Sequence, residues 1–253
     1  MNFTHAISRL PNKNFAAGIT TSALGAPKYD IMLNQHCAYT QTLRQIGLDV
    51  TVLDPLPDFP DAHFVEDVAV LTAEVAILTN PGAAARNGEA RPMEPILAQH
   101  RPIERIHAPG TMDGGDVLQM GKHFFVGISE RTDQIGAEEF GAIVSRHGYT
   151  WIAVDVAAGL HLKSSINALG DNVLLLTEEF AARPEFVGYQ HILIDEDEIY
   201  AANTLRINDY LLTPRGFPKT LAKIETLGLN VIEMETSECK KMDGGLTCLS
   251  LRF

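Results

Sequence analysis

One order of elements, strand, strand, helix, strand, recurs along the chain at intervals of roughly 40 to 50 residues. Each unit is defined by two apolar runs separated by a turn, followed by a helical pattern and another short apolar run. Four complete units are predicted, with strand pairs at 64–71 and 75–79, 116–120 and 123–128, 165–169 and 172–177, and 203–207 and 210–213. Their helices are expected near 92–99, 134–146, 178–187 and 218–227, and their closing strands at 103–107, 150–156, 191–194 and 230–234.

The two ends of the chain supply the parts of a fifth unit. The run 246–253 has no partner after it, and the run 4–10 has none before it but precedes a helix at 29–46 and a strand at 49–53. Pairing the terminal runs closes a ring, which removes open sheet edges. We therefore expect one α/β domain, residues 1–253, folded as a five-bladed α/β propeller of ββαβ-type repeats. The alternative is an ordinary open α/β sheet with the same element order.

The amino-acid composition indicates which kinds of partner and ligand are compatible with the chain. The 253 residues are 45% hydrophobic, which allows a large core, and 20 basic against 32 acidic residues give a net charge of -12. This balance argues against a nucleic-acid partner, which needs a basic stripe, and favours a cationic ligand, although the charge could serve solubility alone. No apolar run approaches the roughly 20 residues that cross a bilayer. No targeting segment opens the chain, and a cytoplasmic protein with no membrane partner is expected.

The three cysteines do not form a disulfide framework or a metal-ligand spacing, so reduced thiols and no metal are expected. Cys248 follows the second of two Met-Asp-Gly-Gly segments, at 112–115 and 242–245. A strand over 246–253 would turn its thiol away from Leu249 and Leu251, and the preceding glycines would let backbone approach a ligand. Cys248 is thus the candidate nucleophile, against the alternative of a small buried hydrophobe. Cys37 and Cys239 are interpreted as structural.

A thiol nucleophile needs a base or proton donor, and His161 stands before the third unit. Asp113 and Asp243 hold equivalent positions before the second and fifth units, and equivalent loops of a ring converge on one mouth of its channel. Asp113 could then accept the second imidazole N–H, as the carboxylate of a triad does. Glu66 and Asp67 open the first unit as adjacent acids, which favours a cationic ligand. The alternative is an exposed capping pair.

Five segments, 64–67, 112–117, 161–164, 201–203 and 243–248, together resemble the dimethylarginine dimethylaminohydrolases of the guanidino-modifying enzyme superfamily. The resemblance covers nearly the whole chain. It implies the five-bladed propeller and hydrolysis of Nω-methylated arginine to citrulline and dimethylamine or methylamine, through a covalent thiouronium on Cys248. It implies a small cationic substrate and no cofactor, and it leaves a homodimer open.

Carried over by position, the resemblance makes Cys248 the nucleophile, His161 the general acid and base, and Asp113 the carboxylate partner of the histidine, where relatives carry Glu. It places Asp61, Glu66 and Asp67 on the guanidinium side and Ile19 in a loop over the pocket. Arg86 and Arg131 would hold the α-carboxylate, although both could form surface ion pairs instead. The implied substrate-binding set is Ile19, Asp61, Glu66, Asp67, Arg86, Arg131, Met242 and Asp243.

Lys163 departs from the wider superfamily, because arginine deiminases carry an aspartate at that position, two residues after the catalytic histidine. Loss of this second carboxylate is compatible with room for N-methyl groups, which have no N–H to donate. An arginine deiminase-like hydrolase, an amidinotransferase acting on another guanidino compound, and an inactive propeller that binds a cationic ligand are the alternatives.

Overall fold

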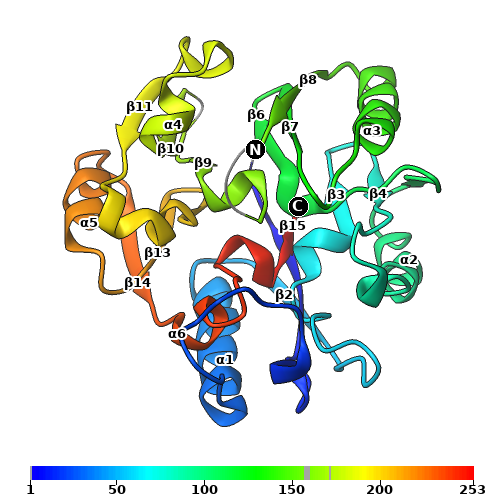
Figure 1. Ribbon diagram of the computed structural model, residues 1–253, viewed down its shortest axis with the longest axis horizontal. Helices are drawn as coiled ribbons and strands as arrows, with labels where there is room; N and C mark the ends of the chain where they lie inside the picture. Colours follow the sequence, from blue (N-terminus) through cyan, green and yellow to red (C-terminus); the bar gives the residue numbers. More distant parts are fainter. Residues whose placement is uncertain (1, 157–159, 171) are drawn as a thin grey trace.

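Short apolar runs build five three-stranded sheets around a central axis (Figure 1) in the computed structural model, which describes residues 2–156, 160–170 and 172–253. In the four sheets that lie within the chain, the first two strands are antiparallel and the third is parallel to the second. These sheets comprise β3 (Ala69–Leu71), β4 (Ala76–Leu78) and β5 (Ile103–Arg105); β6 (Val117–Met120), β7 (His123–Ile128) and β8 (Thr150–Asp155); β9 (Ile166–Ala168), β10 (Val173–Leu176) and β11 (Gln190–Leu193); and β12 (Leu205–Ile207), β13 (Tyr210–Pro214) and β14 (Asn230–Met234).

The fifth sheet joins the two ends of the chain. Its central strand β1 (His5–Arg9) pairs antiparallel with β15 (Leu251–Arg252) and parallel with β2 (Asp49–Leu53). The backbone N–H groups of residues 4 and 5 both donate to the carbonyl of Phe253, at 2.9 and 2.8 Å. The ring is therefore closed by the terminal strands, and the predicted five-bladed α/β propeller is confirmed.

The helices lie outside the sheets (Figure 1): α1 (Tyr29–Gln45), α3 (Gln134–Arg146) and α5 (Pro218–Glu225), with short α2 (Glu94–Leu97), α4 (Glu178–Ala181) and α6 (Ser237–Lys240). Helix α3 begins where the Asp133 side chain accepts from Gly136 N at 2.7 Å, which satisfies a free N-terminal donor. Its inner face buries Phe140 edge-on against Phe124 of β7, with ring centroids 5.3 Å apart. Among the described residues, no helix is both long and apolar enough to cross a membrane.

In four blades a 3₁₀ turn precedes the first strand of the sheet, and in the fifth blade a 3₁₀ turn precedes β15. These turns are η2 (Val65–Val68), η5 (Gly114–Asp116), η6 (Leu162–Ser164), η8 (Glu196–Ala202) and η9 (Thr247–Leu249). The predicted strand 64–71 is therefore wrong at 65–68, where the chain forms η2. The predicted strand 246–253 is wrong at 247–249, where it forms η9. At η9 and at Ser250, which follows it, buried side-chain hydrogen bonds take the place of strand pairing. Ser8 Oγ donates to the Leu249 carbonyl at 2.6 Å, and Ser250 Oγ is hydrogen-bonded to Tyr39 Oη at 2.7 Å. The prediction that strand alternation orients the Cys248 thiol fails for the same reason.

Candidate active site

Four of these turns, η2, η5, η6 and η9, contain or directly follow Glu66, Asp67, Asp113, His161 and Cys248, and two cavities meet beside them. Cys248 and His161 line both cavities. The larger one, called the chamber below, has a volume of about 390 Å³ and includes Glu66 in its wall. The smaller one, of about 30 Å³, is called the small cavity, and its wall holds every other predicted substrate-binding residue: Ile19, Asp61, Asp67, Arg86, Arg131, Met242 and Asp243.

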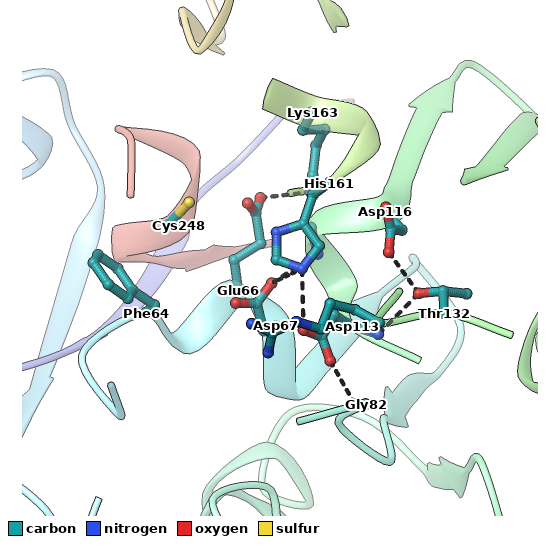
Figure 2. A network of polar contacts seen from close by, with 12 residues as sticks. Phe64, Glu66, Asp67, Gly82, Asp113, Asp116, Thr132, His161, Lys163 and Cys248 are labelled. Carbon is teal, nitrogen blue, oxygen red and sulfur yellow. Dashed lines mark hydrogen bonds and ion pairs between the residues drawn. The ribbon is translucent and has the colours of Figure 1, made fainter. Parts of the chain in front are cut away.

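His161 and Asp113 form the predicted imidazole–carboxylate pair. Each is the residue just before a 3₁₀ turn, η6 and η5 respectively, and each has an extended backbone. His161 Nε2 lies 3.0 Å from Asp113 Oδ2 (Figure 2). Asp113 is fully buried, and its other oxygen accepts from Gly82 N at 3.0 Å. The shorter Asp carboxylate thus reaches the imidazole directly.

The charge of the imidazole is set by its acidic surroundings. Burial alone would lower the His161 pKa, but Asp67, 3.9 Å from Nε2, and the hydrogen bond to Asp113 raise it to about 9. Burial, the largest single effect, would raise the pKa of Asp113, but the hydrogen bond to His161 together with the charges of His161 and Arg86 outweighs burial and lowers that pKa. At neutral pH the site therefore holds an imidazolium whose Nε2 proton is engaged and whose Nδ1 proton remains available for transfer.

Gly115 is the glycine that this arrangement requires. A Cβ at this position would lie 2.7 Å from His161 Nδ1 and 2.8 Å from Asp67 Oδ1. The Gly115 backbone N–H donates to the same Asp67 oxygen at 2.9 Å. Any side chain at residue 115 would therefore displace the imidazole, the carboxylate or both.

Cys248 is half-buried in η9, and its Sγ accepts from Gly245 N at 3.4 Å. Burial, followed by the negative charges of Glu66 and Asp67, raises the pKa of the Cys248 thiol to about 12. The bond from Gly245 and the charge of Lys163 lower this pKa too little to offset those effects. The thiol is therefore neutral at physiological pH until a positive charge approaches.

Thr247, the residue before the nucleophile, is held by side chains from three other parts of the ring. Its N–H donates to Asn203 Oδ1 at 2.9 Å and its hydroxyl donates to Glu66 Oε2 at 2.7 Å. Its carbonyl accepts from Arg252 at 3.0 Å. Sequence reasoning did not assign Asn203, Thr247 or Arg252 to the site. Asn203 belongs to one of the five segments that resemble the family, whereas no motif in the sequence pointed to Arg252 as a site residue.

Glu66 and Asp67 are buried and paired, so the alternative of an exposed capping pair is wrong. Glu66 Oε1 lies 2.6 Å from Lys163 Nζ and 3.0 Å from an Arg252 nitrogen. Asp67 Oδ2 forms an ion pair with the buried Arg86. The alternative of a surface ion pair is therefore wrong for Arg86, while its role toward an α-carboxylate stays a prediction.

Two acids hold the loop that carries Ile19 over the small cavity. Asp61 accepts from Ile19 N at 3.0 Å, and Asp243, which has a positive φ of 56°, accepts from Thr21 N at 2.6 Å. The Thr20 and Thr21 hydroxyls add contacts of 3.1 and 3.0 Å to the same Asp243 oxygen. Asp61 and Asp243 thus fasten the loop, and their direct contact with substrate stays a prediction.

One group of side chains has the spacing of a metal site. Asp67, Asp113 and His161 each offer a ligand atom, and these atoms lie within 4.8 Å of one another. A histidine must be neutral to bind a metal through its free nitrogen. The raised pKa of His161 therefore favours an imidazolium in this cluster over a metal ligand.

Residues 49–186 match the family model described as Arginine deiminase. The chain is 43% identical over 253 residues to N(G),N(G)-dimethylarginine dimethylaminohydrolase of Pseudomonas aeruginosa, covering 99% of this chain and 100% of that protein. The protein of the same name from Streptomyces coelicolor is 33% identical, covering 98% and 96%. Among solved structures, a Cys-to-Ser mutant of the Pseudomonas aeruginosa enzyme complexed with citrulline matches with a TM-score of 0.98 at 42% identity, covering all of both chains. A His-to-Gly variant of dimethylarginine dimethylaminohydrolase, as its adduct with S-methyl-L-thiocitrulline, matches with a TM-score of 0.97 at 43% identity, covering 99% of this chain and 100% of that chain.

Proposed function

Because the chain belongs to the dimethylarginine dimethylaminohydrolases of the arginine deiminase family, we propose that it hydrolyses Nω-methylated arginines to citrulline and dimethylamine or methylamine. The observation that carries the proposal is the meeting of a thiol, an imidazolium and a carboxylate, those of Cys248, His161 and Asp67, around one small cavity. These are the nucleophile, the proton donor and the cation ligand that cleavage of a guanidinium requires.

Asp67 is the acid best placed to hold the guanidinium. A carboxylate has about four lone-pair positions. Glu66 already uses three of them, on Lys163, Arg252 and Thr247, whereas Asp67 uses two, on Gly115 and Arg86. Asp67 therefore keeps more capacity for the substrate, and Glu66 chiefly contributes its charge.

Arg86 and Arg131, with Asp61 and the Ile19 loop nearby, would receive the amino-acid end of the substrate in the small cavity. About 30 Å³ holds only two or three water molecules, on a scale of about 10–15 Å³ each. The loop held by Asp61 and Asp243 must therefore move to admit an arginine.

The first chemical step forms the covalent intermediate. Binding of the guanidinium places a positive charge beside Glu66 and Asp67, which lowers the Cys248 pKa from its resting value of about 12 and releases the thiol proton to solvent. The thiolate attacks the guanidino carbon. His161 donates its Nδ1 proton to the substituted nitrogen, the carbon–nitrogen bond breaks, and the amine leaves an S-linked thiouronium on Cys248.

The second step returns the enzyme to its starting form. His161, now neutral, takes a proton from a water molecule as the water oxygen attacks the thiouronium carbon. Collapse of the tetrahedral adduct expels the Cys248 thiolate, and the hydroxyl proton of the adduct passes to solvent as citrulline leaves. The thiolate then takes up a proton from solvent, because its pKa returns to about 12 once the cationic substrate is gone. Asp113 holds the imidazole through Nε2 in both steps, so the same ring nitrogen gives and takes the proton.

Parallel incubation with asymmetric dimethylarginine, monomethylarginine and arginine tests the proposal, with citrulline and the released amine both measured. Citrulline with dimethylamine or methylamine supports it. Citrulline with ammonia from arginine alone would favour the deiminase-like alternative, and a new guanidino compound would favour an amidinotransferase. Binding of methylarginine without turnover would favour an inactive binding propeller.

We also propose that residues 1–253 form one catalytic domain that works in the cytoplasm, where the reduced thiol that Cys248 must provide is maintained. Association into a homodimer stays a prediction. Light scattering on the purified chain tests it, because a dimer would double the mass of 27.7 kDa.

A further inference from the structure

The chamber is much larger than the amine that methylated arginine releases. Its volume of about 390 Å³ offers room for roughly 25 to 40 water molecules, at about 10–15 Å³ each. Dimethylamine has three heavy atoms and fills a small part of this space. The small cavity, by contrast, has about 30 Å³.

The direction of the bound substrate decides what enters the chamber. Arg86 and Arg131, proposed to hold the α-carboxylate, line the small cavity and not the chamber, and the reacting carbon must lie at Cys248. Cys248 and His161 belong to both cavities. A substituent on the far nitrogen of the guanidinium therefore points past this pair and into the chamber.

The wall of the chamber combines charged side chains, including those of Glu66, Lys163 and Lys240, with the apolar side chains of Leu24 and Ile199. Leu24 and Ile199 line it with 55% and 43% of their surfaces exposed. The Tyr200 ring, which also lines the chamber, is held in place because its hydroxyl donates to the Gly244 carbonyl at 3.0 Å. Leu24, Ile199 and Tyr200 thus give an alkyl or arylalkyl group apolar surface to contact.

We propose that the chamber receives the leaving amine, and that the enzyme consequently hydrolyses arginines that carry one larger alkyl or arylalkyl substituent on Nω. This inference rests on the proposed function and extends its substrate class. The same bond breaks, between the guanidino carbon and the substituted nitrogen. His161 supplies the proton that lets the primary amine depart, and water completes the conversion to citrulline, so no oxidant or other co-reactant is needed.

The test compares asymmetric dimethylarginine with Nω-propylarginine and Nω-benzylarginine on the wild-type protein, with citrulline and the released amine both measured. Citrulline with propylamine and benzylamine, at kcat/KM within about tenfold of the dimethylarginine value, supports the inference. Turnover of dimethylarginine alone overturns it and leaves the proposed function intact. Release of ammonia with Nω-benzylcitrulline also overturns it, because the unsubstituted nitrogen has then left. Turnover of none of the three removes the proposed function and the inference together.

A variant of the wall locates the effect. Ile199→Trp narrows the chamber at an exposed position, and it should lower kcat/KM for Nω-benzylarginine by at least about tenfold while the dimethylarginine value changes less than about twofold. Val187→Trp is the matched control, since Val187 is 69% exposed and does not line the chamber. An equal response of the two substrates to Ile199→Trp, or of the two variants, would contradict the placement of the benzyl group.

Discussion

Replacing Arg252 with methionine should lower both the stability of the fold and the rate of catalysis. The penultimate arginine has 13% of its side chain exposed, and one of its nitrogens lies 3.0 Å from Glu66 Oε1. Another donates to the Thr247 carbonyl at 3.0 Å and also to Ser250. Arg252 thus links the ring-closing strand to the turn that carries Cys248, and methionine keeps the bulk while removing the charge and the donors.

The size of the effect follows from what remains around Glu66. Removing one member of a buried ion pair costs about 3–5 kcal/mol, because the other charge is left without compensation. Glu66 keeps Lys163 at 2.6 Å, which reduces this cost, but the Thr247 carbonyl loses a charged donor, which is a loss of about 1.5–3 kcal/mol. We therefore expect the free energy of unfolding to fall by about 3 kcal/mol, and kcat to fall because the Thr247 turn is less firmly held.

Urea denaturation and citrulline release measure the two effects. Arg215→Met is the matched control, since Arg215 pairs with Glu235 at 2.9 Å but both side chains are 56% exposed, and such a pair contributes less than about 1 kcal/mol. Equal losses of stability in the two variants would show that Arg252 contributes no more to the fold than an exposed ion pair does. Wild-type kcat in Arg252→Met would show that the turn does not need this arginine.

Two further predictions concern the site itself. Gly115→Ala should abolish citrulline release without unfolding the chain, because its Cβ would lie 2.7 Å from His161 Nδ1, whereas Gly188→Ala, with no atom within 4 Å of the new Cβ, should change neither activity nor thermal unfolding. Equal activity in these two glycine variants would contradict the placement of the imidazole. Alkylation of Cys248 by iodoacetamide in the substrate-free protein should rise with pH beyond pH 10, since the Cys248 pKa is raised to about 12 and the thiolate forms as pH approaches that value. A plateau below pH 8 would contradict a neutral resting thiol.

The closed ring could be predicted because its signal lies in the order of the elements. The terminal runs lacked partners, and the only pairing that completed a fifth unit is the one found, with Ala6 opposite Arg252 and Ile7 opposite Leu251. Helix α3 has the bounds that were predicted for it, 134–146, and in the structure Asp133 caps its start. The repeated order of elements and the spacing of the apolar residues were therefore enough to predict the fold.

The turns that carry the chemistry were missed for a physical reason. A 3₁₀ turn of three or four residues is shorter than the window in which a helical period shows, and Val65–Val68 joins directly to the apolar strand β3. The bond between Arg252 and Glu66 joins residues 186 positions apart, and no local pattern reports it. His161 and Asp113 were identifiable from their equivalent positions in the repeat, and Cys248 from the second Met-Asp-Gly-Gly segment just before it.

The covalent role of Cys248 is tested most directly by rapid acid quenching of the protein during turnover of dimethylarginine, followed by digestion and mass spectrometry. We expect the thiouronium adduct on the peptide that contains Cys248, and no turnover by Cys248→Ser, since an alcohol is far less acidic than a thiol and no strong base is placed to ionise it. An adduct on Cys37 or Cys239, or full turnover by Cys248→Ser, would contradict the mechanism.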